Sequence, residues 1–267
     1  MKMDFEAMKA DYEAAWNTPE KLYQHKSMYY TGRIPKTQPE GGKYYSEIIA
    51  GDVVDRELFQ QIHPFCRAPQ APYAPHDFSV IQYSRPTAAG IRRREENIAY
   101  GLCRNGKEAD GSRALFLDYQ YPIVLLRRPG RDQEERRRQQ EEAFGKADLI
   151  YESGNMVYLT ELKNDRSREP LLRCVMEVST YAHQLDPKRF CSHFHCQEAQ
   201  IGKAVMMFED TRPFKDYVDL RKGNRPRLAA LCRQENIAFF MVETTLERTG
   251  IPTDLTGYTI RRLDGQT

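Results

Sequence analysis

The feature that most constrains the fold is a pair of short alternating stretches with turn-forming residues between them. Apolar positions alternate with polar ones over residues 147–152 and again over residues 156–163. The intervening Ser-Gly-Asn at residues 153–155 tolerates the positive φ angles of a tight turn. The sequence therefore predicts two antiparallel strands joined as a hairpin.

Strand pairing predicts where the charged side chains of this hairpin lie. Side chains alternate between faces along a strand, and opposed residues share a face. A turn that closes on an even number of residues places Asp148 opposite Leu159. It then brings Asp148, Glu161 and Lys163 onto one face, whereas Leu162 points to the other. An odd turn would separate the two carboxylates from each other.

An Asp, a hairpin and then Glu-x-Lys resembles the PD-(D/E)XK nuclease superfamily. Its restriction-endonuclease-like fold is shared by archaeal Holliday-junction resolvases and RecB-type exonuclease domains. The resemblance implies that Asp148 and Glu161 hold a divalent metal ion, Mg²⁺ or Mn²⁺, and that Lys163 orients or activates the attacking water. The proline that names the motif is replaced here by Ala147. The alternative interpretation of the same residues is a surface strand with solvated charges.

A predicted helix precedes the hairpin in the sequence RREENIAYGLCRNG. Glu95 is followed by Ile98 and Leu102 at helical spacing, and Gly106 ends the pattern. Members of the family place a further acid on the first helix of the core, which implies that Glu95 contributes to the metal site through water. An ordinary amphipathic helix whose glutamate borders the apolar stripe is the alternative.

The helix predicted over residues 171–185 adds a second resemblance. Glu177, Tyr181 and Gln184 share one side of this helix, next to its apolar face. RecB-type members carry Gln-x-x-x-Tyr there, so Glu177 and Tyr181 are implied as secondary contacts of the site, with glutamate in place of glutamine. A polar ridge on a half-exposed helix is the alternative.

The electrostatics of the predicted site give an expectation for the lysine. Two carboxylates beside Lys163 favour its charged form, so we expect it to be protonated in the metal-free protein. A bound cation would lower its pKa by like-charge repulsion.

Composition excludes several classes of protein. The 267 residues include 40% hydrophobic ones, which is ordinary for a globular chain, and the net charge of +2 argues against indiscriminate electrostatic coating of DNA. The chain has no run of about 18 apolar residues and no apolar N-terminal signal region, so we expect no membrane span and a cytoplasmic location.

Six cysteines are scattered without a disulfide framework, and we expect free thiols. Four metal-type side chains fall close together in CSHFHCQE, residues 191–198. A second pair at the spacing of a structural zinc site is missing, which favours a plain loop there.

The remaining chain is read as an extension followed by a core. Residues 1–90 are predicted to form a mostly helical extension, with helices over residues 2–30 and 45–62 and a proline-rich stretch after them. The core, residues 91–267, adds strands at 114–126, 203–209 and 237–243. The arginine-rich stretch 127–145 is interpreted as a solvated helix, with phosphate contact as the alternative.

These patterns predict an α/β protein, and the resemblance implies a restriction-endonuclease-like core, a central mixed sheet flanked by helices in the order αβββαβ. The function implied is a metal-dependent nuclease that hydrolyses DNA phosphodiester bonds. The alternative is a catalytically inactive protein of this fold that acts as a nucleic-acid-binding or protein-interaction module.

Overall fold

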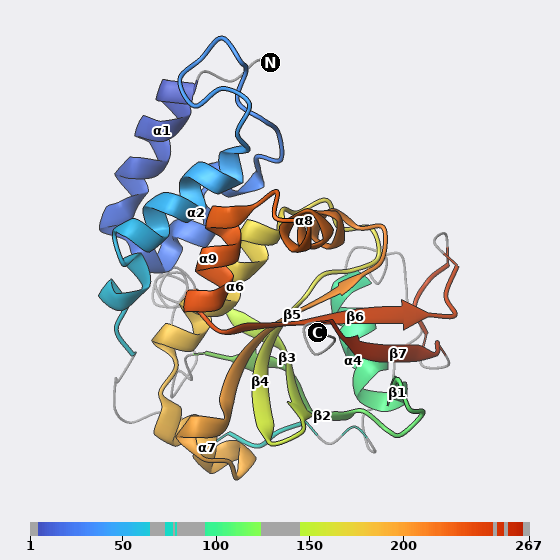
Figure 1. The fold of residues 1–267 in the computed structure, drawn as a ribbon. Helices are drawn as coiled ribbons and strands as arrows, with labels where there is room; N and C mark the ends of the chain where they lie inside the picture. The colour runs from blue at the N-terminus through green and yellow to red at the C-terminus, as the bar shows by residue number, and fades with distance from the viewer. Residues whose placement is uncertain are drawn as a thin grey trace, which may run out of the picture.

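The computed structural model describes residues 5–64, 73–76, 78, 94–123, 145–247, 250–253 and 256–263. These residues form an α/β structure with a seven-stranded mixed sheet flanked by helices (Figure 1). The strands are β1 (Gly106–Glu108), β2 (Leu115–Pro122), β3 (Lys146–Ser153), β4 (Met156–Leu162), β5 (Ile201–Phe208), β6 (Ile237–Thr244) and β7 (Tyr258–Arg262). The α-helices are α1 (Phe5–Glu13), α2 (Tyr45–Asp55), α4 (Arg94–Asn105), α6 (Leu171–Gln184), α7 (Pro187–Phe194), α8 (Arg212–Arg221) and α9 (Pro226–Gln234). Five short 3₁₀ helices are η1 (Ala14–Asn17), η2 (Pro19–Gln24), η3 (Lys26–Tyr29), η4 (Leu58–Gln61) and η5 (Glu198–Gln200).

The sheet has the strand order β1-β7-β6-β5-β4-β3-β2. Strands β2, β3 and β4 form an antiparallel meander, and β4, β5 and β6 are parallel. Strand β7 pairs antiparallel with β6 and parallel with β1. The predicted strands at the centre of the sheet are therefore confirmed, whereas β1 and β7 were not predicted.

The hairpin turn has the predicted even length but lies one residue later in the chain than predicted. Ser153 pairs with Met156 across a turn in which Gly154 takes the left-handed φ of 63°, and Ile150 rather than Asp148 lies opposite Leu159. The expected register is thus wrong by two residues, because Gly154 and Asn155 form the two-residue turn, with Gly154 at the position that takes a positive φ. A shift of two preserves the face of every side chain, and continuing the register places Asp148 opposite Glu161.

Two hydrophobic clusters cover the two faces of the sheet. Leu159 belongs to the cluster under α6, and Leu162 belongs to the cluster under α4. The burial of Ile98 and Leu102 against this second cluster confirms the predicted inward stripe of α4. The two faces of β4 are therefore buried in two separate cores. This burial fixes the direction in which the charged side chains of β4 point.

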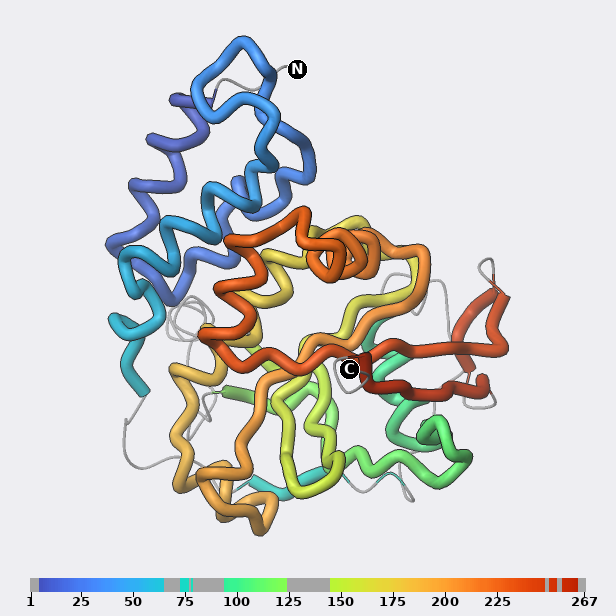
Figure 2. The backbone as a smooth tube through the Cα atoms, in the orientation of Figure 1, coloured from blue at the N-terminus to red at the C-terminus, as the bar shows by residue number. Residues whose placement is uncertain are grey.

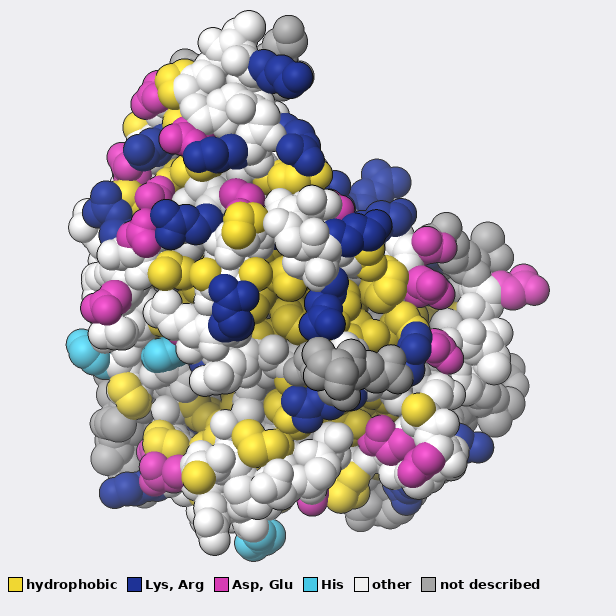
Figure 3. All heavy atoms as spheres, in the orientation of Figure 1, with side chains coloured by type: hydrophobic (Ala, Val, Ile, Leu, Met, Phe, Trp, Pro, Cys, Tyr) yellow, Lys and Arg dark blue, Asp and Glu magenta, His cyan; other side chains and the backbone are white. Residues whose placement is uncertain are grey.

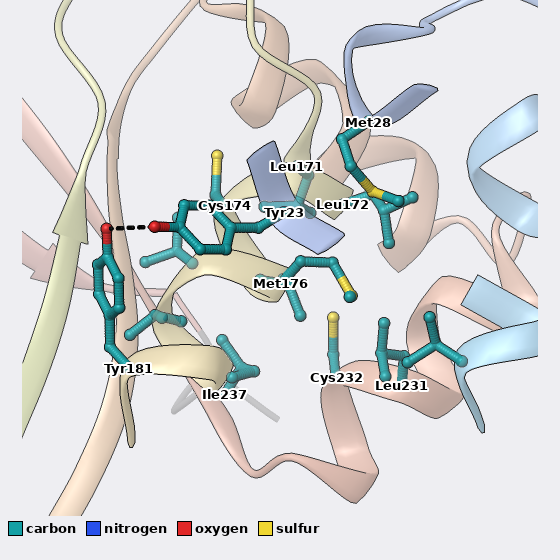
Figure 4. Packing of buried hydrophobic residues seen from close by; sticks show 14 of the residues in the cluster. Tyr23, Met28, Leu171, Leu172, Cys174, Met176, Tyr181, Leu231, Cys232 and Ile237 are labelled. Carbon is teal, nitrogen blue, oxygen red and sulfur yellow. Dashed lines mark hydrogen bonds between the residues drawn. The ribbon is translucent and has the colours of Figure 1, made fainter. Parts of the chain in front are cut away.

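The N-terminal helices pack on the α6 face, close to α9 (Figures 1 and 2). Tyr23 and Met28 lie among the side chains of α6 in the close view of this cluster, where the hydroxyls of Tyr181 and Tyr23 form a hydrogen bond (Figure 4). The prediction of one helix over residues 2–30 is wrong. The α-helix ends at Glu13 and 3₁₀ turns follow it, one of them beginning at Pro19.

Two further expectations are corrected. The helix predicted over residues 45–62 is interrupted where Glu57 adopts a left-handed φ of 52°, so that α2 and η4 are separate. The loop predicted over residues 191–198 begins inside α7, which starts at Pro187 after an N-cap in which Asp186 accepts from the Arg189 N–H.

The arginine-rich stretch after β2 lies outside the described residues, apart from Gly145 at its end. Within the described ranges, no helix is both long and apolar enough to cross a membrane.

Candidate functional site

The β3–β4 hairpin brings its three predicted site residues together. Asp148 lies on β3, Glu161 on β4, and Lys163 follows β4 directly, where its N–H donates to the Met206 carbonyl at 2.8 Å. That bond extends the parallel β4–β5 pairing past the last residue of β4. The ends of the strands therefore hold Lys163 in a fixed position beside Glu161.

The ammonium group of Lys163 lies within a ring of carboxylates. Its Nζ is 2.5 Å from Glu161 Oε1 and 3.1 Å from Glu169 Oε2. Glu95 Oε1 and Glu177 Oε2 are each 3.8 Å from the same nitrogen. Lys163 is only 3% exposed, so these interactions are little screened by water.

Asp148 is held by two hydrogen bonds and has an unusual pKa. Its Oδ2 accepts from the Leu162 N–H at 2.9 Å, and its Oδ1 accepts from Gln120 Nε2 at 3.1 Å. Burial of the carboxyl group and the nearby charge of Glu95 raise the pKa of Asp148 to about 8, against the opposing effect of Lys163. Asp148 therefore exchanges its proton near neutral pH.

The pKa values of the neighbouring Glu161 and Glu177 are shifted in opposite directions. Burial, the charge of Glu177 and that of Asp148 raise the pKa of Glu161 well above its usual range, with Lys163 opposing. For Glu177, burial acts upward, but Lys163 and Arg173 outweigh it and the pKa is lowered. Glu177 is therefore the ionised member of this pair, and Glu161 is the one that holds a proton more readily.

The expected protonation of Lys163 agrees with its surroundings. Burial lowers the pKa of the ammonium group, but Glu161, Glu95 and Glu177 outweigh burial and raise it well above the usual range. Lys163 is therefore charged in the metal-free protein.

Glu95 reaches the site from the first turn of α4 and is fixed by the loop after β4. Its Oε2 accepts from the Asn164 N–H at 3.0 Å and from Asn164 Nδ2 at 3.1 Å. The preceding Arg94 forms a buried bidentate pair with Asp165, at 2.6 and 2.7 Å, and donates to the Gly250 carbonyl at 2.6 Å. These contacts tie the beginning of α4 to the residues that directly follow Lys163.

Helix α6 supplies the remaining predicted residues, and both are buried rather than half-exposed. The Tyr181 hydroxyl donates to Glu177 Oε1 at 2.9 Å. Arg173 Nη1 lies 3.1 Å from Glu177 Oε2 and also pairs with Glu169. The alternative of an exposed polar ridge is therefore wrong for Glu177 and Tyr181, which are 8% and 4% exposed.

Gly145 permits the approach of β3 to this helix. A Cβ atom at position 145 would meet the Tyr181 hydroxyl oxygen at 2.1 Å, far inside van der Waals contact. The absence of a side chain at Gly145 thus leaves room for the tyrosine that contacts Glu177.

The donor set has the chemistry of a divalent cation site. Carboxylate oxygens are the ligands that Mg²⁺ prefers, and acidic side chains outnumber basic ones around Lys163. The acids are Glu95, Asp148, Glu161, Glu169 and Glu177, and the bases are Lys163 and Arg173. Burial is the main cause of the raised pKa values of Asp148 and Glu161, and the neighbouring negative charges raise them further.

The geometry places an ammonium group where such an ion would be expected. In the part of the chain that the structure describes, no group of three or more His, Cys, Asp or Glu side chains is already arranged to hold a metal ion. Lys163 lies among the carboxylates instead. A cation would therefore fit the donor chemistry only when the Lys163 ammonium group moves away from Glu161.

Sequence reasoning missed several partners of the site. Gln120, Asn164, Glu169 and Arg173 all contact predicted site residues. The i, i+4 spacing of Glu169, Arg173 and Glu177 was a signal for one of these networks. The other contacts depend on tertiary packing and had no local signal.

A hollow on the surface lies away from the predicted site. Figure 3 shows apolar side chains gathered between basic ones on the face formed by α8, α9 and the beginnings of β5 and β6. The hollow measures about 1050 Å³ and is lined by residues that include Tyr217, Phe239, Arg221 and Arg233. None of the predicted site residues lines it. The candidate site is thus identified by its cluster of titratable side chains and does not coincide with this hollow.

Comparison of the chain with protein-family models, with curated proteins and with solved structures found no match.

Proposed function

We propose that this protein is a metal-dependent nuclease of the PD-(D/E)XK type that hydrolyses DNA phosphodiester bonds. The observation that carries the proposal is the convergence of Asp148, Glu161 and Lys163 on one face of a hairpin, with Glu95 reaching them from α4. An antiparallel meander followed by a helix and a parallel strand supports the proposed restriction-endonuclease-like core.

Asp148 and Glu161 would hold the ion, Mg²⁺ or Mn²⁺, with Glu95 acting through water. The ion would supply charge neutralisation on the scissile phosphate and a water that ionises near neutral pH. Asp148 and Glu161 must first give up the protons that their raised pKa values favour, so ion binding and proton release are linked.

Lys163 has a role of its own in this proposal. Freed from Glu161, its ammonium group donates hydrogen bonds to the attacking water and to the phosphate oxygen on which charge develops. Glu177 and Glu169 lie 3.8 and 3.1 Å from the same nitrogen and keep it charged and oriented. The Tyr181 hydroxyl holds Glu177 in this position.

The second candidate is a catalytically inactive protein of the same fold that binds nucleic acid or another protein. The position of Lys163 favours this candidate, because its ammonium group already lies against Glu161 and, among the described residues, no group of side chains is arranged to hold a metal ion. Such a protein would bind no divalent ion at Glu161.

The test is incubation of the full chain with plasmid, linear and branched DNA in the presence of Mg²⁺ or Mn²⁺. We expect cleavage of at least one substrate, its loss with EDTA, and its loss in Glu161→Ala. Glu243→Ala is the matched control, because Glu243 is exposed on β6 and pairs only with Arg261 among the described residues. If none of the three substrates is cut with either metal, the proposal is refuted.

A further inference from the structure

Two cysteines near the end of α7 are in direct contact. Cys191 lies within the last turn of the helix, and Cys196 follows the C-cap residue His195, which takes a left-handed φ of 52°. This turn brings the Cys196 N–H to 3.3 Å from the Cys191 carbonyl and the two Sγ atoms to 3.7 Å. The backbone therefore holds the two sulfur atoms together, although five positions separate them.

The accessibility of this pair distinguishes it from the other cysteines that the structure describes. Cys191 and Cys196 are both partly exposed, whereas Cys103, Cys174 and Cys232 are buried. Burial raises the pKa of each of those three thiols, which suppresses their reactive thiolate forms. Among the described cysteines, Cys191 and Cys196 are therefore the ones most accessible to reagents in solution.

The hydrogen bond between the two sulfur atoms gives them different roles. The Cys196 thiol donates to Cys191 Sγ, so a thiolate on Cys191 keeps a hydrogen-bond donor beside it. Burial and this bond raise the pKa of Cys196 to about 11. The acceptor Cys191 is therefore assigned as the attacking sulfur, and the donor Cys196 as the sulfur that reacts second.

We propose that Cys191 and Cys196 form a reversible dithiol–disulfide site that small-molecule disulfides oxidise. The Cys191 thiolate attacks one sulfur of the reagent, which forms a mixed disulfide and releases one reagent thiolate. Cys196 then loses its proton to water and attacks Cys191 Sγ, which closes the intramolecular bond and releases the second reagent thiolate. The two protein thiols are oxidised, and one reagent disulfide is reduced to two thiols. The site is independent of the proposed nuclease chemistry.

The closed form would join α7 to the segment that supports the hairpin turn. Gln200, four residues after Cys196, donates to the Asn155 carbonyl at 3.0 Å. The helix itself is anchored just after β2, where Arg189 donates to the Ile123 carbonyl at 2.7 Å. A disulfide at this position therefore tightens a turn whose two sides are already fixed.

The experiment uses the full chain with Cys66→Ser, which removes the cysteine that lies outside the described residues. The protein is treated with glutathione disulfide, quenched with iodoacetamide, digested with trypsin and analysed by mass spectrometry. Residues 190–203 form one tryptic peptide that contains both cysteines. We expect this peptide to be lighter by two hydrogen atoms and free of alkylation, and reduction with dithiothreitol to restore alkylation at both cysteines.

Variants separate the two roles. Cys196→Ser should accumulate a stable glutathione adduct on Cys191, and Cys191→Ser should leave Cys196 mostly reduced. Cys232→Ser, at a buried position, should behave as the parent chain. Folding of each variant is checked by circular dichroism. Two glutathione adducts on the parent peptide, a disulfide between two chains, or complete alkylation after oxidation would each overturn the proposal.

Discussion

The ammonium nitrogen of Lys163 lies 2.5 Å from Oε1 of Glu161, on the same side of the hairpin. This ion pair occupies the centre of a cluster in which acids outnumber bases. In the proposed function its two members would differ on metal binding, because Glu161 would be a ligand and Lys163 would be a competing positive charge. The proposed activity therefore depends on the exchange of one cation for another at Glu161.

Replacement of Lys163 should separate ion binding from catalysis. We expect Lys163→Met to bind Mg²⁺ as well as the wild type or slightly more tightly, because a competing charge is removed, and to lose DNA cleavage. Glu161→Ala should lose both, as measured by calorimetry and by plasmid cleavage.

Lys203→Met provides the matched control. Lys203 lies on β5, pairs with Glu235 at 2.6 Å and belongs to no part of the site. This variant should bind and cleave as the wild type does. Near-normal cleavage by Lys163→Met at saturating metal would show instead that the lysine is only a counter-ion.

The pKa of Asp148 predicts how stability depends on pH. A folded-state pKa of about 8, above the ordinary value of 3.8, means that the native state retains a proton that the unfolded state has lost. The free energy of unfolding of the metal-free protein should therefore fall as the pH rises between these two values.

Asp148→Asn removes this contribution, so its thermal midpoint should decline less steeply than that of the wild type from about pH 5 to about pH 8. A residual slope should remain, because the pKa of Glu161 is raised as well. The raised pKa of Asp148 would be contradicted if the thermal midpoints of the two proteins fell equally steeply with pH. Thermal unfolding in EDTA, followed by circular dichroism, gives the comparison.

Replacement of Glu177 by glutamine should move the pH dependence without removing the site. Glu177 is among the charges that raise the pKa of both Asp148 and Glu161. We expect Glu177→Gln to lower the pH at which Mg²⁺ binding is half-maximal and to keep cleavage, since the amide still accepts from Tyr181. Mg²⁺ binding followed by calorimetry from pH 5 to pH 9 provides the measurement. An unchanged midpoint would show that Glu177 does not act on these carboxyl groups.

The buried pair of Arg94 and Asp165 should contribute strongly to stability. Arg94→Ala leaves Asp165 buried without its partner, and we expect a loss of about 3–5 kcal/mol in the free energy of unfolding. Arg94→Lys should restore little, because lysine cannot form the bidentate contact. Urea unfolding measures both variants.

An exposed ion pair provides the control for this measurement. Arg227 and Asp55 are 3.3 Å apart, with side chains that are 53% and 58% exposed. Arg227→Ala should therefore change the free energy of unfolding by about 0.5 kcal/mol or less. Equal losses in Arg94→Ala and Arg227→Ala would contradict the account of the buried pair.

Local patterns predicted the centre of the fold well. Alternation of side chains identified β3 and β4, and three- and four-residue spacing identified α4 and α6, because each of these elements buries one face in a core. The shared face of Asp148 and Glu161 survived an error of two residues in register, since side-chain direction depends only on whether the shift is even.

Other parts of the structure depend on contacts between distant segments. Strand β7 has only five residues and is defined by its pairing with β6 and β1. Asn164 and Asp165 resemble ordinary polar loop residues in the sequence, yet they hold Glu95 and Arg94. Such partners follow from the packing of α4 against the sheet, which no local pattern contains.

Titration calorimetry of Mn²⁺ into the metal-free protein near pH 8.5 tests the central claim most directly, because the pKa of Asp148 is about 8 and its carboxyl group is mostly ionised there. The account predicts saturable binding by the wild type and none by Glu161→Ala, with both proteins folded by circular dichroism. The same binding isotherm for both proteins, or no binding by the wild type at millimolar Mn²⁺, would contradict the proposed metal site.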